Sequence, residues 1–549
     1  MTPATPTPAA SLATTTTAGF VPFAPARAAA YRQAGYWTGT TVESLLRTSA
    51  ARRAGHPAVV DEHGALTYRE LDESADRAAH AFLQLGIAPG DRVLLQLPNR
   101  TSFAVAFFGL MRAGALPVMC LPGHRGAELS HFIEVADAVA LVTADTAGGF
   151  DYRALATELA EQHANLRHIV IDGDAGSFTA WSDLLADAAQ QGPLPEVHTD
   201  APALLLVSGG TTAAPKLIPR THEDYVYNAT QAARVCALTE DDAYLVALPA
   251  GHNFPLSCPG LLGAISVGAT TVFLSDPSPE SAFETIARHR VTVTSLVPSL
   301  AQLWAQATAW EPVLPETLRL LQVGGAKLGA EDARTVREAL TPGLQQVFGM
   351  AEGLLCMTRP GDSADILDHT QGRPICDADE VRVVGEDGAE VTPGDTGELL
   401  VRGPYTLNGY YRAEADNARS FTPDGFYRSG DRVRALPDGY LEVTGRIKDV
   451  ILRGGESIAA LDLESHLQTH PAVYAVAAVG LPDQYLGEMV CAAIVFSGKP
   501  ATMTELNQHL QERGAATHSR VDKLVTVPTL PLTAVGKIDK KALLASLTS

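Results

Sequence analysis

The sequence predicts a large α/β domain built on parallel sheets, followed by a small, mobile α+β domain at the C-terminus. Two observations support this fold class. Short apolar strands alternate with longer helical segments through most of the chain, as in parallel sheets with helices on both faces. From about Ile375 the pattern changes to alternating apolar and polar residues between Gly- and Asp-rich turns. In addition, 549 residues exceed what one hydrophobic core usually supports.

The first part of the chain begins with a Thr-, Pro- and Ala-rich stretch, residues 1–18, which we expect to be a disordered tail rather than a signal peptide. Apolar residues at helical spacing then predict helices in TVESLLRTSAARR, LTYRELDESADRAAHAFLQLG and SFAVAFFGLMRAGA. Short apolar runs predict buried strands in RVLLQLP, LPVMCLP, AVALVTAD, RHIVIDG, PALLLVSGG, ATTVFLSD, VTVTSLVPS and LRLLQVGG.

The later part of the chain has a different texture. EVRVVGEDGAEVTPGDTGELLVRG is typical of an antiparallel hairpin or small barrel. A helix near Leu461–Thr469, the strands AVYAVAAVGLP and MVCAAIVF, and a further helix then form a compact unit of about 100 residues. We therefore expect an N-terminal core at 19–447 and a C-terminal domain at 448–549.

Composition restricts the function classes. Forty-one basic against 62 acidic side chains give a net charge of −21, which argues against nucleic acid or an anionic membrane as partner. The apolar runs fall short of the roughly 20 residues needed to cross a bilayer. The cysteines are scattered, without metal-ligand spacing, and predict free thiols in a cytoplasmic protein. They are Cys120, Cys236, Cys258, Cys356, Cys376 and Cys491.

The stretch LLLVSGGTTAAPKLIPRTHEDY, residues 204–225, predicts a phosphate-binding loop. Small residues let backbone N–H groups approach a phosphate, Ser208, Thr211 and Thr212 add hydroxyls, and Lys216 adds a positive charge. The P-loop pattern G-x-x-x-x-G-K-[ST] is not matched. The alternative interpretation is a Ser/Thr/Gly-rich surface loop.

Several further motifs follow in order: ALPAGHNFPLSCPG, QQVFGMAEG, GELLVRGPYTLNGYYR, YRSGDRV, GRIKDVILRGGESI and PLTAVGKIDK. Together with the loop they resemble the core motifs of the adenylate-forming superfamily, which includes acyl-CoA ligases, luciferases and nonribosomal peptide adenylation domains. Within it, KLIPRTH, HNFPL, VGGAKL and FGMAEG are similar to stand-alone aryl-acid–AMP ligases that load siderophore-type assembly lines with salicylate or 2,3-dihydroxybenzoate.

The resemblance implies two half-reactions: a carboxylate attacks the α-phosphorus of Mg·ATP to give an acyl adenylate and pyrophosphate, and a thiol then displaces AMP. It also implies a nucleotide site. Asp431 and Arg446 would hold the ribose, and Glu352 would bind Mg²⁺. Ala213 departs from the glycine usual in the family. The residues implied for the phosphates and adenine are Ser208, Gly209, Gly210, Thr211, Thr212 and Lys216, with Gly324, Gly325, Ala326, Phe348 and Gly349.

Three further residues have implied mechanistic roles. Lys537 would neutralise charge during adenylation by bridging the carboxylate and the α-phosphate or ribose oxygen. Lys448 stands at the family's hinge, about which the small domain turns between the half-reactions. His252 would close the carboxylate side of the pocket rather than act as a base, since the acid is already ionised at neutral pH.

HNFPLSCPG carries the specificity prediction. The Asn253 amide would meet the aryl carboxylate or its ortho-hydroxyl, Phe254 would wall the ring, and Leu355 would narrow the pocket. Cys258 is a weak donor where relatives that prefer 2,3-dihydroxybenzoate tend to have serine, which favours salicylate. Ser257 could bind a second hydroxyl, but alternation along a loop predicts that it faces away. Cys258 as plain core packing is the alternative.

We therefore predict a salicylate–AMP ligase, monomeric or homodimeric, that loads the phosphopantetheine thiol of an aryl carrier protein acting in trans. Only a dozen residues follow Lys537, too few for a carrier domain. The alternatives are a 2,3-dihydroxybenzoate–AMP ligase, an aryl-CoA ligase, and a non-catalytic relative that binds an aryl acid or its adenylate.

Overall fold

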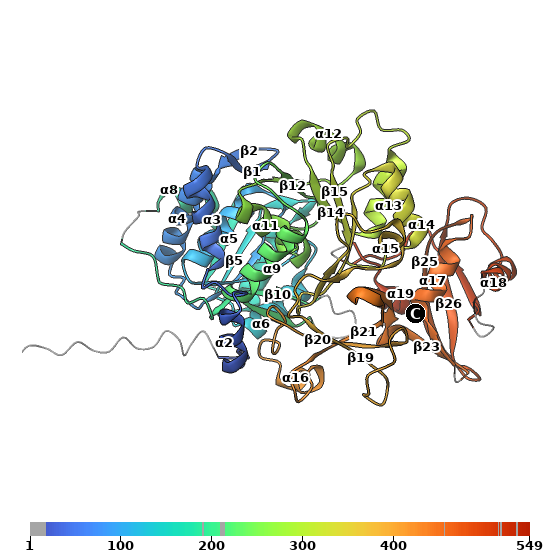
Figure 1. Ribbon diagram of the computed structural model, residues 1–549. Coiled ribbons are helices and arrows are strands. Elements are labelled where there is room, and N and C mark those ends of the chain that lie inside the picture. The colour runs from blue at the N-terminus through green and yellow to red at the C-terminus, as the bar shows by residue number, and fades with distance from the viewer. Residues whose placement is uncertain are drawn as a thin grey trace, which may run out of the picture.

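The computed structural model describes residues 18–188, 192–208, 215–454, 456–513, 515, 519–533 and 536–548. These form two large sheets with covering helices, a four-stranded antiparallel sheet, and a smaller C-terminal domain (Figure 1). The predicted fold class is confirmed. The predicted tail at 1–18 lies outside the described residues except for Ala18.

The first large sheet has seven strands. Neighbouring strands pair in parallel, except that the edge strand β11 is antiparallel to β10. Its order is β11 (Leu217–Thr221), β10 (Pro202–Val207), β4 (Leu116–Met119), β3 (Arg92–Gln96), β5 (Ala140–Ala144), β8 (His168–Asp172) and β9 (Thr179–Ala180). The antiparallel turn between β10 and β11 carries the predicted phosphate loop. A separate two-stranded ribbon joins β6 (Thr146–Ala147) to β7 (Phe150–Asp151).

The second large sheet has nine strands. Its order is β18 (Arg373–Pro374), β17 (Leu355–Met357), β16 (Leu344–Gly349), β15 (Leu320–Gly324), β14 (Val293–Leu296), β12 (Ala243–Val246), β13 (Thr270–Phe273), β1 (Pro57–Asp61) and β2 (Gly64–Thr67). The strands from β16 to β1 run parallel, and the edge strands are antiparallel. The carboxyl ends of β15 and β16 therefore meet at one edge, where VGGAKL and FGMAEG begin.

Helices connect and cover these sheets. They are α2 (Pro25–Gln33), α3 (Val42–Arg53), α4 (Tyr68–Leu85), α5 (Thr101–Arg112), α6 (Gly126–Ala136), α7 (Tyr152–Gln162), α8 (Trp181–Ala186), α9 (His222–Val235), α10 (Asn253–Ser257), α11 (Gly260–Val267), α12 (Pro279–His289), α13 (Pro298–Ala307), α14 (Ala330–Ala339), α15 (Ala364–His369) and α16 (Glu414–Ser420).

The central helices form the common core of the two large sheets. In α5 every residue from Phe103 to Arg112 is buried, as its almost continuous apolar sequence predicts. Helix α4 begins at a capping box between Thr67 and Glu70 and ends at Gly86 in the left-handed conformation. One hydrophobic cluster contains residues from these helices, from α9 and α11, and from both sheets. The motif on α10 that is predicted to bind the acid is thus anchored in this core.

A four-stranded antiparallel sheet follows, with the order β19 (Glu380–Val384), β20 (Thr396–Arg402), β21 (Tyr427–Ala435) and β22 (Leu441–Arg446). A 3₁₀ turn, η1 (Pro437–Gly439), joins β21 to β22. The predicted hairpin from EVRVV to LLVRG is confirmed. The register pairs Asp431 with Arg446 on adjacent strands, so two predicted ribose ligands lie side by side.

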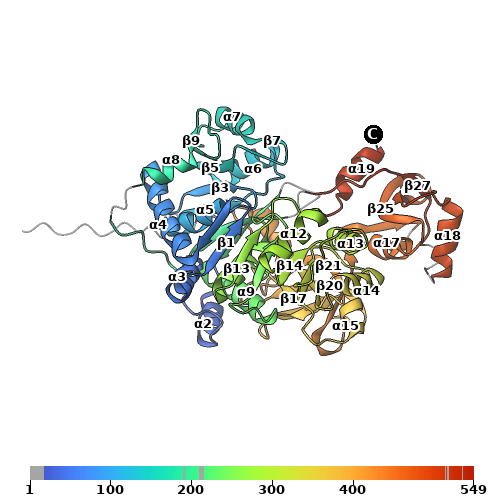
Figure 2. The ribbon, with the colours of Figure 1, turned by 90° about the horizontal axis from the view of Figure 1, so that it is seen from above.

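The C-terminal domain has its own sheet and its own core around Ile451, Leu463 and Ile494. It contains η2 (Ile447–Asp449), β23 (Val450–Arg453), β24 (Glu456–Ala459), α17 (Ala460–Gln468), β25 (Val473–Asp483), β26 (Gly487–Phe496), α18 (Met503–Glu512), β27 (Lys523–Thr526) and α19 (Lys540–Thr548). Seen from above, these elements gather beside α13 and α14 at one end of the molecule (Figure 2). The exact boundary at 447/448 stays a prediction.

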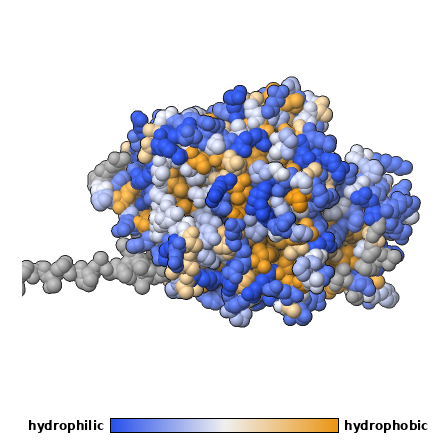
Figure 3. Space-filling view, in the orientation of Figure 1, coloured by the Kyte–Doolittle hydropathy of each residue, from blue (hydrophilic) through white to orange (hydrophobic). Residues whose placement is uncertain are grey.

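The surface agrees with the acidic composition. Figure 3 shows that hydrophilic residues cover most of the displayed face, with hydrophobic residues in separate smaller groups. None of the helices within the described ranges is both long and apolar enough to span a bilayer. All six cysteines are buried free thiols, as predicted. In the part of the chain that the structure describes, no group of three or more His, Cys, Asp and Glu side chains could hold a metal ion.

Candidate active site

The candidate site lies where the ends of β15 and β16, the β21–β22 pair and Lys537 of the C-terminal domain meet. Gly325, just after β15, has a φ of +85°. A Cβ at this glycine would lie 3.0 Å from Lys537 Cε, so the close approach of the lysine depends on the missing side chain. Gly325 was predicted to line the adenine site, whereas in the structure it lies against Lys537.

Lys537 is surrounded by ionisable groups. Burial, followed by the positive charge of Arg446, lowers its pKa to about 8, while Asp431 and Glu352 act to raise it. The charge of Lys537 in turn adds to the burial that lowers the pKa of His252 to about 3. The structure thus brings Lys537, which stands 91 positions after Arg446, close enough to four other predicted residues for their charges to affect one another's pKa. These four are Arg446, Asp431, Glu352 and His252.

Asp431 and Arg446 form a pair at the same place. Asp431 is buried, and its Oδ1 accepts a hydrogen bond of 2.8 Å from Arg446 Nε. Burial raises the pKa of Asp431, and the positive charges of Arg446 and Lys537 oppose that shift. The carboxylate keeps Oδ2 for a further hydrogen-bond donor, as a ribose diol would require.

On the phosphate side, Ser208 and Lys216 close the loop at its base. Ser208 N donates to Lys216 O at 2.9 Å, and Lys216 N donates to Ser208 Oγ at 2.8 Å. Lys216 Nζ lies 3.7 Å from Asp416 Oδ1 and 4.7 Å from the centre of the Tyr410 ring. The predicted ligands Gly209, Gly210, Thr211 and Thr212, and the unusual Ala213, lie outside the described residues.

Glu352 follows β16 and is held by Tyr410, which in turn contacts Tyr427. Tyr410 Oη donates to Glu352 Oε1 at 2.9 Å and lies 2.9 Å from Tyr427 Oη. Both tyrosines are buried. This contact fixes one carboxylate oxygen and leaves the other for a cation. Because Mg²⁺ needs only one or two protein carboxylates beside phosphates and waters, Glu352 fits such an ion.

The predicted adenine residues lie along one edge of the nine-stranded sheet. Phe348 is half-buried at the end of β16, and Gly349 and Ala326 are exposed beside it. Gly324 is packed differently from the prediction, because a Cβ there would lie 3.1 Å from the ring of Phe254. Gly324 therefore makes room for the acid pocket, while Phe348, Gly349 and Ala326 remain open to a nucleotide base.

The acid-pocket motif is a short helix, α10, and not the loop that the sequence analysis assumed. His252 caps it, since its Nδ1 accepts from Phe254 N at 3.3 Å. The helical turn brings Ser257 Oγ to 3.2 Å from Asn253 Oδ1, and Asn253 Nδ2 lies 3.5 Å from Cys258 Sγ. The alternation argument was therefore wrong, because residues four apart in a helix share a face.

The remaining predicted residues flank this pocket. Phe254 is buried against Gly324, and Leu355 on β17 pairs with Gly349 across the antiparallel ladder. Lys448 lies in η2, the turn that leaves Arg446 and enters the C-terminal domain. Its role as a hinge stays a prediction.

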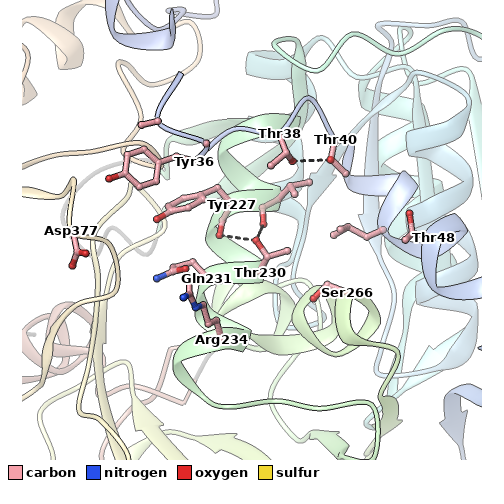
Figure 4. Close-up of a pocket in the computed structure, with 14 residues that line it drawn as sticks. Tyr36, Thr38, Thr40, Thr48, Tyr227, Thr230, Gln231, Arg234, Ser266 and Asp377 are labelled. Atoms are coloured by element: carbon pink, nitrogen blue, oxygen red, sulfur yellow. Dashed lines mark hydrogen bonds between the residues drawn. The ribbon is translucent and has the colours of Figure 1, made fainter. Parts of the chain in front are cut away.

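A cavity of about 630 Å³ lies against α9 and is lined by none of the predicted site residues. Figure 4 shows Tyr36 beside Tyr227, Thr230, Gln231 and Arg234 of α9 at this cavity. Tyr227 is two positions from Tyr225, so the two tyrosines leave the helix on nearly opposite sides. The cavity is therefore separate from the acid pocket.

Two family profiles match the chain, one in each of its two parts. The profile described as AMP-binding enzyme matches residues 46–411. The chain belongs to this family of AMP-binding enzymes. The profile of the AMP-binding enzyme C-terminal domain matches residues 462–537, the segment that ends at the half-buried Lys537. The resemblance to adenylate-forming enzymes is confirmed, and membership implies ATP as a substrate.

This AMP-binding enzyme has close relatives. It is 63% identical to the salicyl-AMP ligase / salicyl-S-ArCP synthetase of Mycobacterium tuberculosis, over 96% of this chain and 94% of that protein. It is 46% identical to the 2,3-dihydroxybenzoate-AMP ligase of Bacillus subtilis, over 96% and 97% of the two chains.

Solved structures agree. The Mycobacterium smegmatis MbtA apo structure is 64% identical with a TM-score of 0.76, covering 96% of this chain and 98% of that one. The anthranilate CoA ligase AuaEII in complex with anthranoyl-AMP, at 23% identity and a TM-score of 0.84, shares the fold over 93% and 97% of the chains.

The sequence analysis missed several residues of this AMP-binding enzyme that contact the predicted ones. Tyr410 donates to Glu352 and contacts Tyr427, and Asp416 pairs with Lys216. Tyr410 lies in the quoted motif GYYR, which is the one signal that could have found it. Tyr225 and Asn228 of α9 contact the predicted acid motif; Tyr225 ends the quoted stretch 204–225, whereas Asn228 lies in none of the quoted motifs.

Proposed function

We propose that this enzyme joins an aryl carboxylic acid, salicylate, to AMP with release of pyrophosphate. It then transfers the acyl group to the phosphopantetheine thiol of a carrier protein acting in trans, as at the start of siderophore-type peptide assembly. The observation that carries the proposal is the position of Lys537, partly buried among Asp431, Arg446, Glu352 and His252. The similarity to a salicyl-AMP ligase supports it. The buried free thiols are in keeping with a cytoplasmic location.

In the proposed adenylation step the acid attacks as a carboxylate, which is already ionised at neutral pH. Repulsion between the carboxylate and the α-phosphate is the main obstacle, and the Lys537 ammonium offsets it. His252 stays neutral, because its pKa is lowered to about 3, and it shapes the pocket without supplying charge. Asp431 and Arg446 orient the ribose, and Lys216 binds the leaving phosphates. Mg²⁺ at Glu352 would supply further neutralisation of phosphate charge.

The rate of adenylation should depend on the protonation of Lys537. Because burial lowers the pKa of this lysine to about 8, kcat/KM for pyrophosphate exchange is expected to fall as pH rises through that value. The active form is protonated, so the loss occurs on the alkaline side. Bound ATP raises the pKa, so kcat should decline only at higher pH.

Full pH profiles of both parameters provide the measurement. Lys537→Arg is the matched control, because a guanidinium stays charged and should remove the alkaline limb from whatever activity remains. A kcat/KM that stays level to about pH 9 in the wild type would contradict this account.

The choice of acid is proposed to depend on Cys258. The side chain is buried, and burial raises its pKa to about 11, so it is a neutral thiol and a weak donor. A catechol's second hydroxyl placed here would lack a good partner, at a cost of about 1–3 kcal/mol. The relative that is a 2,3-dihydroxybenzoate-AMP ligase makes this acid the second candidate.

Cys258→Ser is expected to raise kcat/KM for 2,3-dihydroxybenzoate relative to salicylate by about 5- to 150-fold. Pyrophosphate exchange with both acids, in wild type and variant, measures the ratio. Cys491→Ser, at a buried thiol on β26 of the C-terminal domain, serves as the matched control and should leave the ratio unchanged. A wild type that prefers the catechol would overturn the choice of salicylate.

A further inference from the structure

A buried polar network lies between α9 and α10. Asn253 Oδ1 accepts two hydrogen bonds, from Tyr225 Oη at 3.0 Å and from Ser257 Oγ at 3.2 Å. Asn228 Nδ2 donates to Ser257 O at 2.7 Å and to Ser257 Oγ at 3.2 Å. Tyr225 and Ser257 have no exposed surface, and Asn253 retains 9%. The hydrogen bonds therefore form inside the protein, without competition from solvent.

These contacts decide which way the Asn253 amide points. Ser257 Oγ accepts from Asn228, and its own proton is directed to Asn253, with Oδ1 at 3.2 Å nearer than the backbone oxygen at 3.5 Å. Tyr225 Oη donates to the same oxygen at 3.0 Å and also lies within hydrogen-bonding reach of Ser257. Turning the amide over would place an NH₂ group against both hydroxyls and remove the oxygen to which they donate, which is unfavourable.

The amide nitrogen is consequently the atom left for a ligand. Both acceptor positions of Oδ1 are occupied, whereas Nδ2 has only the weak acceptor Cys258 Sγ at 3.5 Å. We propose that Tyr225 and Ser257 act as positioning residues that lock Asn253 as a hydrogen-bond donor, so that the pocket selects acids whose ortho group is an acceptor. This inference rests on the proposed function, in which Asn253 meets the ortho group of the acid.

The chemistry of ortho-substituted benzoates then sets the selectivity. The hydroxyl of salicylate donates to its own carboxylate and keeps oxygen lone pairs for Asn253 Nδ2. The amino group of 2-aminobenzoate also donates to its carboxylate, but its second N–H points outward and its lone pair is delocalised into the ring. Two donors would then face each other, which should disfavour 2-aminobenzoate by roughly 10- to 100-fold.

The test is the ratio of kcat/KM values for salicylate and 2-aminobenzoate in pyrophosphate exchange. In the double variant Tyr225→Phe/Ser257→Ala the amide is free to turn and to offer its oxygen to the amino group. We expect the ratio to fall at least about tenfold, with the KM for ATP unchanged. A ratio equal to that of the wild type, with both acids reduced alike, would overturn the lock.

Two further variants keep the test decisive. Tyr225→Phe removes one hydroxyl and no volume from the core, so it reports on the ratio even if the double variant does not fold. Tyr227→Phe is the control, because this tyrosine of the same helix lines the separate cavity in Figure 4. An equal change of the ratio in Tyr227→Phe would assign the effect to α9 as a whole and refute the lock.

The outcome also separates the two proposals. A wild type that exchanges pyrophosphate with neither acid would refute the proposed function and this inference with it. A wild type that activates salicylate, but whose ratio is insensitive to Tyr225 and Ser257, would refute the inference alone.

Discussion

Replacing Lys537 with alanine is expected to reduce pyrophosphate exchange by about 10²- to 10³-fold, while thioester formation from supplied acyl-AMP is largely retained. The ammonium stands within the charged cluster of Asp431, Arg446 and Glu352, next to the acid pocket. Its charge is needed while the carboxylate approaches the phosphate. Once the adenylate has formed, that repulsion no longer has to be overcome.

The two half-reactions should be measured separately, by pyrophosphate exchange and by acyl transfer to a phosphopantetheine thiol. Lys541→Ala is the matched control, since this lysine is exposed on α19 only four positions away and should affect neither step. Equal losses of both half-reactions in Lys537→Ala would refute the proposed role.

Lys448→Pro is expected to slow acyl transfer on the order of 10²-fold and adenylation by less than about tenfold. The residue lies in the 3₁₀ turn η2 between Arg446 and the C-terminal domain. A proline fixes φ near the value of such a turn and so holds the observed arrangement, in which Lys537 is in the site. The small cost to adenylation comes from the restriction that proline places on Ile447.

Lys448→Ala separates the backbone effect from the side chain, because it removes the lysine's contacts but keeps φ and ψ free. It should retain most of both activities. Unchanged acyl transfer in Lys448→Pro would rule out a hinge at this position, and an equal loss in Lys448→Ala would assign the effect to the side chain.

Local patterns in the sequence were sufficient to predict the fold. The apolar run of α5, the capped amphipathic helix α4 and the hairpin of β19 and β20 each formed as periodicity and turn residues indicated. Such features depend on neighbours three or four residues away in a helix, or across a short turn in a hairpin. The order of the motifs along the chain was likewise sufficient to identify the superfamily.

Contacts between distant segments could not be predicted in this way. Tyr410 is 58 positions from Glu352, and Tyr225 is 28 positions from the amide that it orients. The acid motif was misread as a loop because five residues are too few for helical periodicity to be recognised.

The sequence alone indicates which chemical groups are present: a glycine-rich stretch with Lys216, the carboxylates Glu352 and Asp431, and Lys537 near the C-terminus. Only the tertiary structure decided what each group faces. It placed Lys537 against Gly325, gave Glu352 the Tyr410 hydroxyl as a partner, and brought the Tyr225 and Ser257 hydroxyls to the amide oxygen of Asn253. The reason is physical: a buried polar group must satisfy its hydrogen bonds with whatever side chains the fold brings near it, and these come from distant parts of the chain.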